Sequence, residues 1–236
     1  MRSNTRARRA IERGEHTNPK RAHIGTYRIW VINNRRLPQP KVRQGYRHAS
    51  LKDISYASLV KFLNTEGKKR LLFPVVTKKL MQQWGITAEN STVILYKDEI
   101  VGFGAIVDRR AIKQYRIVRM PKIVELLRTP WNSFARRFRY IGIPKLNTAL
   151  ACPVATLVCV KDDEPALFAS IVSTLGRISQ ASSDIFMLAL AETSPHTALV
   201  DTKYNFKLTN DLYCTSETMN IGGMAADLYV DALMLY

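Results

Sequence analysis

Residues 153–192 constrain the fold more than any other part of the sequence. The segment begins with the uninterrupted apolar run PVATLVCV (Pro153–Val160), which is typical of a central strand buried on both faces of a sheet. Acidic residues then precede Pro165, a combination that marks the N-terminus of a helix. DIFMLALAE (Asp184–Glu192) follows as a second strand, so the segment predicts a strand–helix–strand unit of an α/β protein. Apolar residues at helical spacing define the buried face of its helix: Leu167, Phe168, Ile171, Val172, Leu175 and Ile178.

Shorter patterns add elements on both sides of this unit. Upstream, GYRHAS predicts a short strand, Asp53 or Ser55 caps one amphipathic helix, and Thr77 caps a second helix that ends at Gly85. STVILY and EIVGFGAIV predict two strands joined by a tight turn at Lys97-Asp98, and the strand glycines indicate a bulge or a close backbone approach. The remaining expected elements are a basic strand (115–119), helical turns (123–127 and 131–138), a short helix (194–204) and two closing strands (206–215 and 227–236). The fold class is therefore α/β (α+β), a mixed central sheet flanked by helices.

The first 43 residues form a basic helix–strand segment. Asn4 and Gly14 bracket a predicted helix, and YRIWVI (Tyr27–Ile32) predicts a strand. The proline-containing, basic stretch Asn33–Gln44 is typical of a linker. Residues 1–50 hold 13 Lys and Arg against 2 Asp and Glu, a net of +11 in a chain whose total is +17. This asymmetry favours an anionic partner, although a solvated basic surface would have the same composition.

Several classes of protein receive no support from the sequence. The three cysteines are odd in number and lack CxxC spacing, which argues against a disulfide framework and against a zinc site. The four histidines lie far apart, so each is expected to be a surface or packed residue, and no metal is predicted. No apolar run approaches the length of a membrane span and no signal-peptide core is present, so we expect a cytoplasmic protein without membrane contact.

The order of elements from residue 46 to 236 resembles that of the GNAT N-acetyltransferase superfamily. Four stretches also resemble the C-terminal domain of bacterial tandem GNAT proteins: FLNTEGKKRLLFPVVT (62–77), VDRRAIKQYRI (107–117), YIGIPKL (140–146) and LYVDALML (228–235). Asn4, Ala7 and Gly14 match the superfamily's late helix, and the strand after them looks like a late strand. The resemblance therefore implies two parts. Residues 1–43 would be the remnant of an upstream GNAT domain with a linker, the alternative being an ordinary basic N-terminal extension, and residues 44–236 would be a GNAT-like acyltransferase domain.

The resemblance also implies a co-substrate and a reaction. Members of the superfamily bind acetyl-CoA or another acyl-CoA where two central strands part, and transfer the acyl group to an amine without a metal. By analogy, Leu157, Val158, Cys159 and Val160 face the pantetheine arm, and Lys161 begins the loop that meets the diphosphate. Catalytic candidates are Asp108 and Glu192 at strand ends and Tyr204 near the position of the superfamily's tyrosine acid, where Asp201 also falls.

One loop departs from the superfamily's pattern. Its glycine-rich diphosphate loop is replaced by KDDEPA (Lys161–Ala166), in which three carboxylates begin the helix and Pro165 supplies no amide. Like charges about 4 Å apart cost on the order of 1 kcal/mol each in water, so we expect the usual diphosphate contacts to be weakened.

Three functions remain open on the sequence. The first is an acyl-CoA-dependent N-acyltransferase, and the second is a non-catalytic, degenerate GNAT module that supports an upstream domain or a second copy in a homodimer. The third is a nucleic-acid binder that uses the basic arm and FARRFRY (Phe134–Tyr140), where arginines alternate with aromatic residues. The first is the preferred interpretation.

Overall fold

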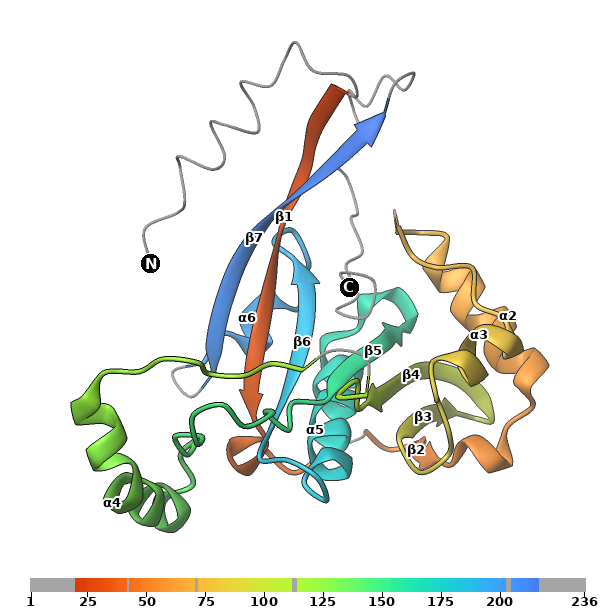
Figure 1. Ribbon diagram of the computed structural model, residues 1–236. Coiled ribbons are helices and arrows are strands. Elements are labelled where there is room, and N and C mark those ends of the chain that lie inside the picture. The colour runs from red at the N-terminus through yellow and green to blue at the C-terminus, as the bar shows by residue number, and fades with distance from the viewer. Residues whose placement is uncertain (1–19, 42, 71, 112–113, 203–204, 217–236) are drawn as a thin grey trace.

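A computed structural model describes residues 20–41, 43–70, 72–111, 114–202 and 205–216 (Figure 1). The predicted N-terminal helix, Tyr204 and the last predicted strand lie outside these ranges. The strands are β1 (Lys20–Asn33), β2 (Tyr46–Ala49), β3 (Ser91–Tyr96), β4 (Glu99–Val107), β5 (Val154–Val160), β6 (Ile185–Ala191) and β7 (Phe206–Ser216). The α-helices are α2 (Tyr56–Gly67), α3 (Lys78–Gln83), α4 (Lys122–Phe138), α5 (Pro165–Ser179) and α6 (Thr197–Val200), and the short 3-10 helices are η1 (Asn34–Arg36), η2 (Leu51–Asp53) and η3 (Lys161–Asp163).

The described strands form one seven-stranded mixed sheet in the order β2-β3-β4-β5-β6-β1-β7. Neighbouring strands are antiparallel except for β5 and β6, which are parallel and are connected through α5. The mixed sheet flanked by helices confirms the predicted fold class, and β5 is buried along its whole length, as its apolar sequence predicted.

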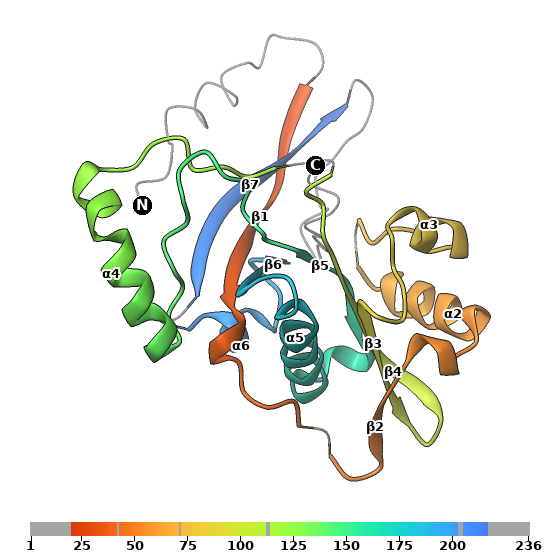
Figure 2. The ribbon, with the colours of Figure 1, turned by 60° about the horizontal axis from the view of Figure 1, so that its bottom comes forward.

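Two apolar cores lie on opposite faces of the sheet. Helices α2 and α3 cover one face, and α5 covers the other (Figure 2). Strand β6 shows how the period of two divides its residues between them: Phe186 and Leu188 pack toward α5, whereas Met187 and Ala189 pack toward α2. The sheet is therefore the middle of three layers.

Helix α5 lies so close to β4 that glycine is required beneath it. A Cβ on Gly104 would come within 2.6 Å of Ile171 Cγ2, and a Cβ on Gly102 within 2.9 Å of Ile171 Cδ1. The register between β4 and β5 also shifts between Phe103 and Ala105. Both expectations for the strand glycines, a bulge and a close approach, are confirmed.

Strand β1 belongs to the same sheet as the strands that follow it. It pairs antiparallel with β6 on one side and with β7 on the other. Its residues Trp30 and Ile32 are 0% exposed and lie in the core beneath α5. The basic N-terminal segment therefore supplies a central strand, and the proposed boundary at residue 43 falls within one continuous sheet.

Local boundaries follow the sequence with three differences. Ser55 stands at the N-cap of α2 but makes no side-chain capping hydrogen bond, and Asp53 accepts from Ser50 N instead. The Thr77 hydroxyl accepts a hydrogen bond from Leu80 N at 3.1 Å as the predicted cap of α3, and Gly85 ends that segment at a φ of +69°. The predicted strand at 115–119 is only an isolated bridge between Arg116 and Ala149. The two predicted helical turns at 123–138 join into α4, which continues through Pro130 and projects away from the sheet (Figures 1 and 2).

Candidate functional site

The two parallel strands of the sheet diverge. Strands β5 and β6 pair at a single position, Val154 opposite Met187. Next to it, Met187 N donates a hydrogen bond to Pro153 O at 2.8 Å. Beyond that position they separate toward their C-terminal ends, and Figure 1 shows them spreading apart. The backbone edge of β5 beyond Val154 is therefore not paired with β6.

A bulge lies halfway along β5, on the side of β4. The register shifts between Phe103 and Ala105, and Leu157 has a φ of +49°, which is unusual for a residue with a branched side chain. The bulge lies three residues beyond Val154, in the part of β5 that has already parted from β6.

The predicted pantetheine-facing residues are core residues by their side chains. Leu157 and Cys159 pack in the α2 core, whereas Val158 and Val160 pack in the α5 core. Burial raises the pKa of the Cys159 thiol to about 12, so the sulfur is protonated and is a poor nucleophile. These four residues could contact an acyl donor only through their backbone. The Lys161 ammonium lies 3.8 Å from the Glu99 carboxylate, on the side of β4.

The loop between β5 and α5 is held by its own charges. Asp162 and Asp163 both adopt left-handed backbone conformations, with φ of 51° and 52°. The Asp163 carboxylate pairs with the Arg70 guanidinium and lies 3.4 Å from His196 Nε2. The hydrogen bond from His196, followed by the charge of Arg70, holds the pKa of Asp163 below its usual range despite its partial burial. The loop carboxylate is therefore ionised and occupied by protein partners.

Two basic partners of this loop lie just after α2. Lys69 Nζ lies 2.7 Å from Glu66 Oε2 and 3.2 Å from Asp162 Oδ1, and Arg70 follows it in the chain. Both belong to FLNTEGKKRLLFPVVT, one of the stretches on which the family resemblance rested. In the structure, this stretch pairs with Asp162 and Asp163, whereas Glu164 lies 3.5 Å from Arg43.

His196 is the member of this cluster that the sequence did not single out. Its ring is 3% exposed and stacks on Phe168 with centroids 4.0 Å apart and planes 5° from parallel. Its Nε2 faces Asp163, while Nδ1 is buried without a hydrogen-bond partner among the described residues. His196 was expected to be a surface or packed residue, and it is packed. Its pairing with an aspartate 33 positions earlier in the chain gave no local sequence signal.

The catalytic candidates do not form one constellation. Asp108 directly follows β4. It lies beside the start of β5, the end at which β5 is paired with β6, and its carboxylate lies 2.6 Å from Arg110 Nη2. The hydrogen bond from Arg110 lowers the pKa of Asp108, which weakens it as a base. Glu192 follows β6 at the diverging end, five residues beyond Met187 or about 16 Å away, and pairs with Arg28. Asp108 and Glu192 therefore cannot act together on one reacting atom, and Tyr204 lies outside the described residues.

No group of three or more His, Cys, Asp or Glu side chains in the described ranges could hold a metal ion. None of the helices in those ranges is long and apolar enough to cross a membrane.

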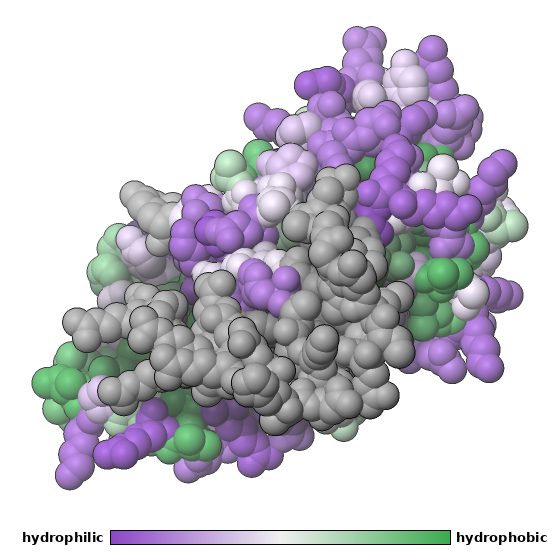
Figure 3. Space-filling model, turned by 90° about the horizontal axis from the view of Figure 1, so that it is seen from above, coloured by the Kyte–Doolittle hydropathy of each residue, from purple (hydrophilic) through white to green (hydrophobic). Residues whose placement is uncertain are grey.

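Exposed apolar residues gather on α4, for example Leu126 at 77%, and Figure 3 shows the resulting apolar surface at the left edge of the view.

The aromatic residues of FARRFRY stack mainly on one another. The rings of Phe134 and Phe138 lie 4.4 Å apart, and those of Phe134 and Tyr140 lie 6.1 Å apart. The Arg36 guanidinium lies 4.8 Å from the Tyr140 ring centroid. The stacking surfaces that a nucleic acid would use are therefore partly engaged within the protein.

Comparison with solved structures identifies the architecture. A GCN5-related N-acetyltransferase from Sphaerobacter thermophilus superposes with a TM-score of 0.52 at 12% identity, over 89% of this chain and 57% of its own length. The chain has the GNAT fold. A Drosophila protein (TM-score 0.48, 11% identity, 91% and 57% covered) and a GNAT-family acetyltransferase from Novosphingobium aromaticivorans (0.43, 8%, 85% and 70%) are also similar. No protein-family model and no curated protein sequence matches the chain.

The acyl-CoA that GNAT enzymes use contains a pantetheine arm and a diphosphate. An extended pantetheine arm, whose amides can pair with strand backbone, could lie where β5 diverges from β6. The loop before α5 does not suit a diphosphate, because Asp162, Asp163 and Glu164 surround the helix N-terminus and Pro165 lacks an amide.

Proposed function

We propose that the chain is an N-acyltransferase that takes an acyl group from a CoA thioester and passes it to an amine. The observation that carries this proposal is the divergence of the parallel strands β5 and β6 after the single pair Val154–Met187. Where two parallel strands part in this way, an extended ligand can lie between them and pair with strand backbone. The bulge at Leu157 supports the same interpretation, because bulges re-aim strands next to active sites. The chain spans 57% of the length of the Sphaerobacter structure. Any activity that needs the rest of such a protein is therefore part of the proposal.

The catalytic base and the amine acceptor belong to this proposal as well. An acyl transfer needs a group that takes the proton from the attacking amine. Glu192 is the candidate at the diverging end of the strands, and Asp108 and Tyr204 remain candidates from the sequence. The protein's formal charge of +17 favours an acceptor that carries negative charge elsewhere in its structure.

A second function is favoured by the acidic loop. A GNAT-fold module that has lost donor binding could close its diphosphate site with ion pairs, and the contacts of Asp163 with Arg70 and His196 support this alternative. Such a module would support an upstream domain or a second copy of the chain. The two functions differ in whether an acyl thioester binds at all.

Calorimetric titration with two ligands separates the two functions. The ligands are acetyl-CoA and S-acetylpantetheine, which lacks the diphosphate and the nucleotide. If the acyltransferase proposal is right, both ligands bind, and acetyl-CoA binds no more than about threefold more tightly because its diphosphate meets carboxylates. Asp162→Asn should then strengthen acetyl-CoA binding by a few-fold and leave S-acetylpantetheine unchanged. Asp98→Asn is the matched control, because it removes an equally exposed carboxylate from the β3–β4 turn.

The outcomes lead to different conclusions. Failure of both thioesters to bind at millimolar concentration would refute the acyltransferase and leave the supporting module. Acetyl-CoA binding a hundredfold more tightly than S-acetylpantetheine would show that the acidic loop does accept a diphosphate. Transfer to a panel of amines, followed by mass spectrometry, then tests the reaction itself, and Glu192→Gln should lower the rate if Glu192 is the base.

A further inference from the structure

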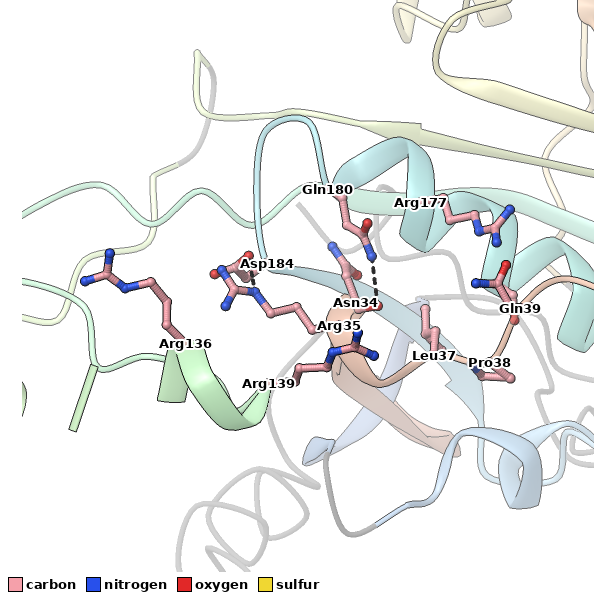
Figure 4. Close-up of a pocket in the computed structure, with 11 residues that line it drawn as sticks. Asn34, Arg35, Leu37, Pro38, Gln39, Arg136, Arg139, Arg177, Gln180 and Asp184 are labelled. Atoms are coloured by element: carbon pink, nitrogen blue, oxygen red, sulfur yellow. Dashed lines mark hydrogen bonds and ion pairs between the residues drawn. The ribbon is translucent and has the colours of Figure 1, made fainter. Parts of the chain in front are cut away.

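A cavity of about 480 Å³ lies at the end of α5 opposite the acidic loop (Figure 4). Three parts of the chain that are distant in sequence line it: the turn after β1, the C-terminus of α4, and the C-terminal half of α5 with the residues before β6. Arg177 lies 12 residues along α5 from Pro165, or about 18 Å from the start of the helix. The cavity is therefore separate from the diverging ends of β5 and β6, where an acyl donor would enter.

The lining of this cavity is strongly positive. It contains Arg35, Arg136, Arg139 and Arg177 against one carboxylate, Asp184, for a formal net charge of +3. Asp184 Oδ1 lies 2.7 Å from Arg35 Nε, so the single acid is already paired. The other three arginines have no ion-pair partner in the described part of the chain. Their uncompensated charge favours an anion in the cavity.

The floor of the cavity is held by hydrogen bonds. Asn34 is 2% exposed, and its amide nitrogen donates to Ser179 Oγ and, at 2.9 Å, to Ser183 O. Gln180 Nε2 donates to Asn34 O at 3.0 Å, as drawn in Figure 4. The turn after β1 and the C-terminal end of α5 are therefore fixed relative to one another before any ligand binds, which lowers the cost of binding.

The C-terminus of α4 is fixed in the same way. Arg36 Nε donates to Arg139 O at 3.0 Å, and Asn33 Nδ2 donates to the same oxygen at 3.0 Å. These bonds hold the end of α4 against the turn that follows β1. Arg136 and Arg139 thus have a defined backbone position beside the cavity.

The positive groups are spread along the cavity rather than gathered at one point. In Figure 4, Arg177 and Gln39 lie at one end, Arg139 and Arg35 in the middle, and Arg136 at the other end. A ligand that meets several of them must be elongated and carry separate negative groups. The volume is within the range of small-molecule sites, and guanidinium groups match phosphate oxygens in geometry.

A single-stranded nucleic acid fits this arrangement less well. Such strands are bound by a basic groove together with aromatic rings on which the bases stack. Arg136 is two residues from Phe134 and therefore about 200° around α4 from it. The rings of α4 thus lie on the opposite side of the helix from the cavity. Arg137, by contrast, lies about 60° from Phe134 and would serve the nucleic-acid interpretation.

We propose that this cavity binds a small, elongated polyanion that carries at least two phosphate groups, such as a polyphosphate or a nucleoside diphosphate. The site is independent of the proposed acyl transfer. It is defined by Arg136, Arg139 and Arg177 around the fixed floor at Asn34. An inorganic chain and a nucleotide share this chemistry, so the probes below distinguish them.

Calorimetric titration of the full chain at constant ionic strength tests the site, with inorganic phosphate, tripolyphosphate and guanosine diphosphate as probes. We expect tripolyphosphate to bind at least tenfold more tightly than inorganic phosphate, which reaches fewer arginines. Arg177→Ala and Arg136→Ala should each weaken tripolyphosphate about tenfold. Arg137→Ala removes the same charge from the adjacent position of α4 and should leave the affinity within twofold. Guanosine diphosphate binding more tightly than tripolyphosphate would identify a nucleotide as the ligand.

Two results would overturn the proposal. The first is the absence of binding by tripolyphosphate and by guanosine diphosphate at millimolar concentration, with circular dichroism showing a folded protein. The second is an equal loss of affinity in Arg136→Ala, Arg137→Ala and Arg177→Ala, which would indicate diffuse attraction to a basic surface. Tight binding of single-stranded RNA that is lost in Arg137→Ala but kept in Arg177→Ala would favour the nucleic-acid surface in place of this site.

Discussion

Trp30 provides the sharpest test of whether the N-terminal strand belongs to the folding unit of the GNAT domain. It lies on β1, is 0% exposed, and packs in the core formed with α5, β5 and β6. Replacing a fully buried tryptophan with alanine removes its transfer free energy and leaves a cavity, at a cost of about 3–5 kcal/mol. Domains are stable by about 5–15 kcal/mol, so Trp30→Ala should remove a large fraction of the total.

The assay is thermal and urea unfolding of the full chain, followed by circular dichroism. For a protein of this size, each kcal/mol lowers the melting temperature by about 2–4 °C, so Trp30→Ala should melt roughly 6–20 °C below the wild type. The matched control is Trp131→Ala on α4. Trp131 is 38% exposed, donates a hydrogen bond to Ile141 O and contacts the ring of Phe134, so the same substitution should cost about 1–2 kcal/mol.

Equal melting temperatures for the two variants would refute the reasoning. That result would mean that β1 unfolds separately from the sheet, as an appended remnant would. A single transition lowered only by Trp30→Ala, with an unchanged dependence on urea, would show that residues 20–33 and the sheet fold as one cooperative unit.

Two further predictions concern α5 and its neighbours. Gly104→Ala should cost about 1–3 kcal/mol because its Cβ would overlap Ile171 Cγ2 at 2.6 Å. Ile171→Ala removes that methyl group, so the double variant should cost less than the sum of the two single variants, and strictly additive costs would contradict this. Burial, followed by the charge of Arg177, holds the pKa of His48 below 6.5. The folded state therefore favours neutral His48, and its contribution to stability is present above pH 6.5 and is lost as the pH falls below that value. Titration of the His48 ring by NMR should show this low pKa and a rise toward 6.5 in Arg177→Ala; an unchanged value would argue against the contribution of Arg177.

Local patterns in the sequence were sufficient for most elements of the sheet. The apolar run of β5, the Thr77 cap and the positive φ at Gly85 each depend on residues within a few positions, and each is confirmed. Where the outcome depends on partners distant in sequence, the same reasoning was incomplete. Tyr27–Ile32 was correctly expected to be a strand, but nothing near it indicates that it pairs with β6 about 160 residues later.

In the candidate site, too, local features could be predicted and contacts between distant residues could not. The sequence was enough to place three carboxylates before α5 and to expect that they disfavour a diphosphate. Its local patterns did not show that Arg70 and His196 meet Asp163, because these contacts depend on how α2 and the residues after β6 pack around the loop. Asp108 and Glu192 were chosen because they end strands, yet they end strands at opposite ends of the diverging pair.

The charges along α5 connect these observations. Carboxylates at its N-terminus and Arg177 near its C-terminus both complement the helix dipole, so both stabilise the folded chain. A GNAT domain that binds a diphosphate leaves the helix N-terminus to the ligand, which then supplies the negative charge. In this chain, Asp163 and its partners supply that charge permanently, so a diphosphate would have to displace an ion pair that the fold already contains. Anion binding is instead favoured at the opposite end of the helix, where arginines outnumber acids. An acyl donor would then be held mainly through its thioester and pantetheine, and a phosphorylated ligand through a separate site on the same helix.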